Sequence, residues 1–234
     1  MSIALLELGA AALDELLPEV VFVGGASIEL WITDPAAPPV RPTKDVDVVV
    51  EVVTRSEFYA FEARLRGKGF SEDQEDGVIC RWRHDASDLI LDAMPARADI
   101  LGFENRWQAA ALPHAIQRVL PSGRLIRVAS PPYLLATKLE AFKSRGKADL
   151  LGSRDFGDVI ALFDGRSELV DEVLAAEADV RDYIAEELRS LLAAPRIGDG
   201  LAGAVRPDAA SQARVDEIIM PAIHRLSVVR SEEP

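Results

Sequence analysis

Residues 43–52 read TKDVDVVVEV, and this stretch decides the fold. The run of valines predicts a buried β-strand, because branched apolar side chains favour strands. The strand nevertheless opens with two carboxylates, Asp45 and Asp47. Residues two apart on a strand project from the same face, so we expect these acids to lie side by side. Burying unpaired charges is costly, and a cation is therefore expected beside them.

A glycine turn precedes this strand. Residues 20–24, VVFVG, predict a short buried strand, and Gly24-Gly25-Ala26-Ser27 leads from it into a helix that carries Ile28 and Trp31. Glycine lets the backbone approach a ligand closely, and the amides at a helix start favour anions. The Ser27 hydroxyl adds a donor. The turn therefore indicates a phosphate site, although no Gly-Lys-Ser/Thr follows and it is not a Walker A loop.

A third carboxylate, Asp92, lies inside the predicted strand DLILDAMP (88–95). If this strand neighbours residues 45–50 in one sheet, then Asp45, Asp47 and Asp92 converge. Carboxylates without histidine or cysteine suit Mg²⁺ or Mn²⁺. Two such ions about 3.5–4 Å apart can hold the attacking and leaving oxygens of a phosphoryl displacement. The sequence therefore predicts a metal site at Asp45, Asp47 and Asp92.

The rest of the chain divides near residue 130. Before it, we expect helices at 3–17, after Thr54 or Ser56, and at 105–112, an irregular proline-rich loop at 33–44, and hairpins at 78–95 and 115–129. After it, helices are expected at 133–145, 154–163, 167–194 and 207–226. The prediction is an α+β fold: a mixed sheet with flanking helices in residues 1–129, followed by a helical C-terminal domain in residues 130–234.

Composition limits the possible functions. The 234 residues include 39 acidic and 26 basic side chains, a formal net charge of −13, which disfavours non-specific coating of DNA. Cys80 is the only cysteine, so no internal disulfide or cysteine metal site is expected. No apolar stretch approaches the roughly 18 residues of a membrane span, and the N-terminus does not have the pattern of a signal peptide. We expect a cytoplasmic protein with no membrane partner.

The motifs together resemble a known family. Gly24-Gly25-x-Ser27, Asp45-x-Asp47 and the later Asp92 resemble the nucleotidyltransferase fold of the DNA polymerase beta superfamily. KLEAFKSRG (138–146) and RDFGD (154–158) are similar to motifs of AbiEii-type nucleotidyltransferase toxins. That group includes the MenT-type toxins of type IV-like toxin–antitoxin pairs. The resemblance covers roughly residues 20–163.

The resemblance implies metal-dependent transfer of a nucleoside monophosphate from an NTP to an acceptor hydroxyl, with the 3′ end of tRNA as the expected acceptor and a cognate antitoxin as a possible partner. Asp45 and Asp47 would hold the metals, and Asp92 would complete the site and help deprotonate the acceptor. Lys138 would reach the triphosphate, and Asp158 would belong to the catalytic set. The expected substrate-binding residues are Gly24, Gly25, Ser27, Thr43, Lys44, Arg145, Arg154 and Asp155. We expect the active site in a groove between the two halves.

Local charge permits an RNA acceptor. Residues 138–154 hold five basic side chains and two acidic ones, so this segment is positive within an acidic chain. A basic strip of this kind can take one RNA end without binding nucleic acid everywhere.

Other interpretations remain open at this point. Asp-x-Asp alone is also typical of a solvated turn, Lys138 of a solvated helix face, and Asp155 and Asp158 of the acidic first turn of a helix. The same metal site would also serve an enzyme that modifies a small molecule such as an aminoglycoside, or a protein hydroxyl. A non-catalytic regulator or antitoxin with this fold is a third possibility.

Overall fold

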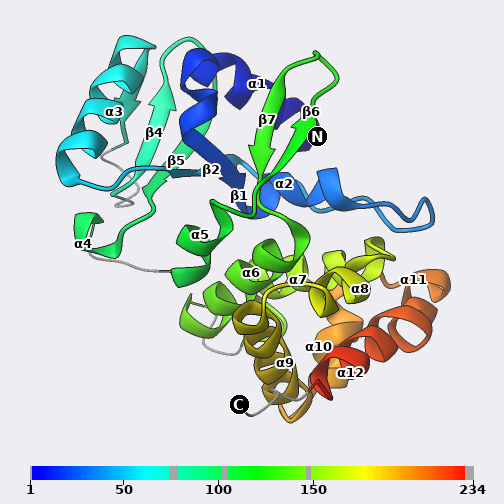
Figure 1. Ribbon diagram of the computed structural model, residues 1–234. Coiled ribbons are helices and arrows are strands. Elements are labelled where there is room, and N and C mark those ends of the chain that lie inside the picture. Colours follow the sequence, from blue (N-terminus) through cyan, green and yellow to red (C-terminus); the bar gives the residue numbers. More distant parts are fainter. Residues whose placement is uncertain (1, 74–78, 102–104, 146–148, 230–234) are drawn as a thin grey trace. The chain divides into compact units, whose positions relative to one another are not determined.

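The computed structural model describes residues 2–73, 79–101, 105–145 and 149–229 (Figure 1). The chain forms two compact units. The N-terminal unit comprises Met1–Glu29 and Arg41–Ser130, and the C-terminal unit comprises Leu30–Val40 and Pro131–Pro234. The segment Leu30–Val40 therefore belongs to the C-terminal unit although it lies early in the sequence.

The N-terminal unit is built on a seven-stranded sheet of order β3-β4-β5-β2-β1-β7-β6. The pairs β2–β5 and β1–β7 are parallel and the others are antiparallel, so the sheet is mixed, as predicted. Both predicted hairpins are present, as β4–β5 and β6–β7. The strands are β1 (Val20–Val23), β2 (Asp45–Val50), β3 (Phe70–Glu72), β4 (Arg81–His84), β5 (Ile90–Pro95), β6 (Ile116–Val119) and β7 (Leu125–Val128).

Helices flank this sheet, and α1 and α2 contact β2. Thr54 begins α3 with a capping box: its side chain accepts from the Glu57 amide, and the Glu57 carboxylate accepts from the Thr54 amide. Asn105 caps α5. The helices are α1 (Ser2–Leu13), α2 (Gly24–Ser27), α3 (Arg55–Gly67), α4 (Ala98–Leu101) and α5 (Arg106–Ala111), with 3₁₀ turns at Asp14–Glu19 and Ile28–Trp31.

The predicted helix 3–17 is wrong at its C-terminal end. The α-helix stops at Leu13, and Asp14 adopts a left-handed conformation with φ of 49°. Aspartate tolerates this region better than most residues, and Pro18 excludes a regular helix downstream. The chain instead continues as the 3₁₀ turn Asp14–Glu19, which buries Leu16.

The C-terminal unit is helical. Helix α6 packs against α7, α8 and α9, and α12 packs against α8 and α9. The helices are α6 (Pro131–Arg145), α7 (Arg154–Gly165), α8 (Leu169–Leu174), α9 (Ala178–Leu192), α10 (Ile197–Ala204), α11 (Ala209–Arg214) and α12 (Met220–Ser227), with a π-helical turn at Val215–Ile219. No helix among the described residues is long and apolar enough to cross a membrane.

The predicted helix 167–194 is two helices, α8 and α9, separated at residues 175–177. Ala-Ala-Glu at this break favours helix, so local propensity does not explain it. On either side of the break, apolar side chains enter the core: Val170 and Val173 of α8, and Val180, Ile184 and Leu188 of α9. Both helices contact α6 and α12.

Polar contacts attach the segment Leu30–Val40 to the C-terminal unit. The Gly165 carbonyl accepts from the amides of Thr33 and Asp34 at 2.8 and 3.0 Å. The Arg166 guanidinium donates to the Trp31 carbonyl at 2.9 Å, and Arg214 donates to Asp34 at 2.7 Å. A Cβ at Gly165 would lie 2.6 Å from the terminal methyl of Ile32, so a larger residue here would require the Ile32 side chain to shift.

Candidate active site

Strand register gathers the three predicted carboxylates on one face of the sheet. Strands β2 and β5 run parallel, with Asp47 opposite Asp92 and Asp45 opposite Ile90. Partners in register point the same way, and alternate residues of one strand share a face. The predicted adjacency of the two strands is therefore confirmed. The rest of β2 is core, since Val46, Val48, Val49 and Val50 are fully buried.

The glycine turn lies directly against Asp47. Strand β1 pairs with β2 so that Val23 is opposite Asp47, and Gly24 follows with φ of +74°. A Cβ at Gly24 would lie 2.0 Å from Asp47 Oδ2, well inside van der Waals contact. The position therefore requires glycine twice, for its backbone angle and for space. Helix α2 begins at Gly24 and contacts β2.

Neighbouring hydroxyl groups are already engaged. The buried Ser27 hydroxyl donates to the Gly24 carbonyl at 2.8 Å, which braces the glycine turn. The Thr43 hydroxyl donates to Asp45 Oδ1 at 2.7 Å. Lys44 is exposed. Ser27 thus stabilises the glycine turn, and Thr43 holds the Asp45 carboxylate.

Arg81 is the site residue that the sequence prediction missed. Its Nε and Nη2 atoms donate to Asp92 Oδ1 and Oδ2, both at 2.8 Å, and Nη2 also donates to Asp45 Oδ2 at 3.1 Å. Antiparallel pairing of β4 with β5 places Arg81 opposite Asp92. The alternating sequence RWRH, with Trp82 buried and arginines on the other face, was the available signal.

The guanidinium fills the space among the carboxylates. Arg81, Asp45 and Asp92 have side-chain exposures of 15%, 30% and 10%, so the Arg81–Asp92 pair is shielded from water and Asp45 is partly exposed. Among the described residues, no three carboxylate, imidazole or thiol groups form a ready metal cluster. The cation expected beside Asp45 is thus supplied, in this structure, by the chain itself.

The charges of this cluster affect the pKa of Cys80. Burial, followed by the negative charges of Asp92 and Asp47, raises the pKa of its thiol to about 12. The thiol is therefore protonated and unreactive at neutral pH. The predicted role of Cys80 as a small core residue agrees with its burial.

A second charged cluster lies in the C-terminal unit, between α6 and α7. Lys138 Nζ lies 2.6 Å from Asp158 Oδ2 and 3.3 Å from Asp155 Oδ1. The side chains of Lys138 and Asp158 are 10% and 1% exposed. The alternative of a solvated lysine is therefore wrong. Ser153 caps α7 and places both aspartates on the helix face that meets α6.

The predicted basic strip is partly neutralised. Besides Lys138, Lys143 is paired with Glu187 at 2.5 Å. Arg154 is exposed at the start of α7. The side chain of Arg145 and all of Lys147 lie outside the described part of the structure. The strip therefore offers less uncompensated charge than its composition suggests.

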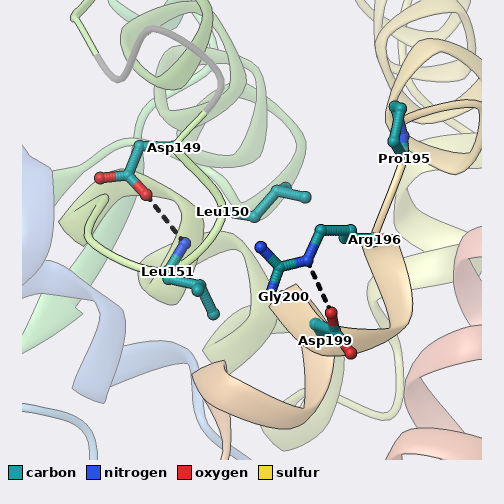
Figure 2. Close-up of a pocket in the computed structure, with 7 residues that line it drawn as sticks. All are labelled: Asp149, Leu150, Leu151, Pro195, Arg196, Asp199 and Gly200. Carbon is teal, nitrogen blue, oxygen red and sulfur yellow. Dashed lines mark hydrogen bonds and ion pairs between the residues drawn. The ribbon is translucent and has the colours of Figure 1, made fainter.

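The C-terminal unit also has a shallow pocket of about 200 Å³ (Figure 2). Its charged groups have local partners: Asp149 accepts from the Leu151 amide at 3.1 Å, and Arg196 donates to Asp199 at 2.8 Å. The lining residues are Asp149, Leu150, Leu151, Pro195, Arg196, Asp199 and Gly200. None of the predicted site residues lines it, and we assign it no ligand.

A comparison with known families identifies the family of this chain. The family model for "Nucleotidyl transferase AbiEii toxin, Type IV TA system" matches residues 7–225. The chain belongs to the AbiEii family. It is therefore a nucleotidyltransferase, of a family of toxins from type IV toxin–antitoxin systems. The AbiEii match runs through both units and includes every site residue predicted from the sequence. No curated protein matches the chain.

Proposed function

We propose that this AbiEii-family chain transfers a nucleoside monophosphate from an NTP to the 3′ end of tRNA in a reaction that needs Mg²⁺ or Mn²⁺. The observation that carries the proposal is the in-register pair Asp47–Asp92, with Asp45 on the same face and the Gly24 turn against Asp47. A phosphate-binding turn beside clustered carboxylates suits phosphoryl chemistry.

The carboxylates fit a hard divalent cation. Asp45, Asp47 and Asp92 supply only oxygen donors, which Mg²⁺ and Mn²⁺ prefer. A cation is already stable among them, because the Arg81 guanidinium bridges Asp45 and Asp92. These three aspartates would hold the metal. When bound, it would offset charge on the phosphates and on the attacking oxygen.

The proposed reaction is a substitution at the α-phosphorus of the NTP. The acceptor hydroxyl oxygen forms a bond to this phosphorus, and the bond to the bridging oxygen breaks to release pyrophosphate. The hydroxyl proton passes to Asp92. The amides at the start of α2 bind phosphate oxygens, since helix N-termini favour anions.

Lys138 and Asp158 complete the proposed catalytic set, and Asp155 is a proposed substrate-binding residue. The two aspartates hold the Lys138 ammonium in a fixed, largely dry position. To contact a triphosphate, the Lys138 ammonium would exchange these carboxylate contacts for phosphate oxygens. Arg154, exposed at the start of α7, and Arg145 are proposed contacts for phosphate or the acceptor.

The test is incubation of the chain with each of the four α-labelled NTPs, Mg²⁺ or Mn²⁺, and total tRNA. We expect label on tRNA, lost on periodate treatment of the RNA 3′ end beforehand and absent with chelator. Asp47→Asn is expected to abolish transfer while the circular dichroism spectrum is unchanged. Absence of labelled RNA with all four nucleotides would refute the tRNA proposal.

The same reactions distinguish the alternative acceptors. The formal charge of −13 favours cationic acceptors such as aminoglycosides, so one arm replaces tRNA with these compounds. A second arm contains a cell extract treated with ribonuclease. Label on the drug or on a protein, with tRNA unlabelled, would reassign the acceptor and keep the chemistry.

A further inference from the structure

Arg81 occupies the position among the carboxylates that the proposed function requires for a metal ion. The following inference rests on that function. Asp92 has both oxygens bound by Arg81, and Asp45 has one oxygen bound by Arg81 and the other by Thr43. Paired two-point contacts between arginine and a carboxylate are among the strongest hydrogen bonds in proteins.

We infer that Arg81 is a built-in competitor of the metal cation. Without metal and nucleotide, its guanidinium holds Asp45 and Asp92 in position and offsets their mutual repulsion. A divalent cation gains these carboxylates only when the Arg81 contacts open. Arg81 is therefore a positioning residue that makes metal binding weak until a nucleotide contributes its phosphate oxygens.

The contacts suggest the order in which they open. Arg81 binds Asp45 at 3.1 Å, and the Asp45 side chain is 30% exposed; it binds both oxygens of Asp92 at 2.8 Å, and the Asp92 side chain is 10% exposed. Longer and more exposed contacts are weaker than short, shielded ones. The Arg81–Asp45 contact is therefore expected to open before the Arg81–Asp92 contact.

Arg83 provides a matched control. It lies two residues along β4 on the same face, and it is also paired with a buried carboxylate, at 2.8 Å from Asp73. Asp73 is not among the proposed metal ligands. Arg83→Gln therefore removes a second arginine–carboxylate pair of β4, with a more exposed arginine (47% against 15%), and leaves the carboxylate site untouched.

The experiment titrates Mn²⁺ into the natural chain, Arg81→Gln and Arg83→Gln, without nucleotide, and follows free Mn²⁺ by electron paramagnetic resonance. We expect Arg81→Gln to bind Mn²⁺ about tenfold more tightly or better, the effect of removing one charge-assisted competitor. Arg83→Gln should bind as the natural chain does. Arg81→Gln combined with Asp45→Asn should lose the gain, which would place the metal on these carboxylates.

Arg81→Lys keeps the experiment decisive if Arg81→Gln does not fold. Lysine keeps the charge but cannot form the two-point contact, so its Mn²⁺ affinity should lie between those of the natural chain and Arg81→Gln. Folded variants that bind Mn²⁺ no more tightly than the natural chain would overturn the inference. Nucleotide transfer is scored separately, so its absence refutes the proposed function while the Mn²⁺ titration still decides the role of Arg81.

Discussion

Gly24 lies so close to Asp47 that a methyl group at position 24 would overlap the Asp47 carboxylate, with 2.0 Å between Cβ and Oδ2. Gly24→Ala is therefore expected to displace Asp47 and to strain a backbone with φ of +74°. Nucleotide transfer should fall by at least about 100-fold, the order seen when a catalytic group is misplaced by about 1 Å. The measurement is the initial rate of labelling.

The control for this variant is Gly157→Ala. Gly157 lies within α7, and a Cβ there would meet no atom within 4 Å. Alanine favours helix over glycine, so this variant should gain about 0.5–1 kcal/mol in unfolding free energy. Equal loss of activity in both variants would contradict the specific role of the Gly24–Asp47 contact.

Lys138→Met should destabilise the chain strongly. It breaks the ion pair between Lys138 and Asp158, whose side chain is 1% exposed, and breaking a buried pair costs about 3 kcal/mol or more. Lys143→Met in the same helix removes a pair with Glu187 whose lysine is 60% exposed, and it should cost less than Lys138→Met. Urea unfolding measures both variants. Addition of Asp158→Asn to Lys138→Met should recover stability, and no recovery would show that the charge pair is not the cause.

Stability should fall in alkali because two buried acids keep their protons. Burial and nearby carboxylates raise the pKa of Cys80 from 9.0 to about 12 and that of Tyr133 from 10.0 to about 12. Between these values the folded chain holds more protons than the unfolded chain, so the unfolding free energy decreases as pH rises from 9 to 12. Chemical unfolding at a series of pH values measures this slope.

The double variant Cys80→Ala, Tyr133→Phe should flatten the slope, since neither replacement ionises. For each protein, the unfolding free energy at each pH is expressed relative to its own value at pH 7. Any loss of packing in the variant is subtracted in this way. An unchanged slope would mean that other groups cause the alkaline loss.

Arg214→Ala should free the segment Leu30–Val40. Arg214 joins Asp34 at 2.7 Å to Asp164, whose side chain is 5% exposed. Faster cleavage by proteinase K within residues 33–41, mapped by mass spectrometry, is the expected result. Arg225→Ala breaks an exposed pair with Asp171 and should leave the cleavage rate unchanged. Equal rates in both variants would exclude Arg214 as the attachment.

The sequence predicted the parts of the fold that have strong local signals. Valine runs marked β1 and β2, and the Pro-Ser-Gly turn marked the β6–β7 hairpin. Of the two predicted caps, Thr54 and Ser56, the structure uses Thr54 to begin α3. Strand β3 was missed because three residues, two of them exposed, carry no readable alternation.

The candidate site was predictable where spacing within one strand decides geometry. Asp45 and Asp47 share a face by alternation alone. Arg81 was not predicted because its role depends on the register of β4 against β5, which sequence periodicity does not determine. The burial of Lys138 likewise follows from the packing of α6 on α7.

The segment Leu30–Val40 has a consequence for biosynthesis. It leaves the ribosome early, but its partners Gly165, Arg166 and Arg214 are translated long afterwards. A nascent chain that ends near residue 130 contains every strand of the β-sheet. The hydrogen-bonding partners of its segment Leu30–Val40 have not yet been synthesised. Synthesis of most of the polypeptide must therefore precede completion of the fold, and a fragment cut at the sheet's last strand is expected to remain susceptible to proteolysis at this stretch.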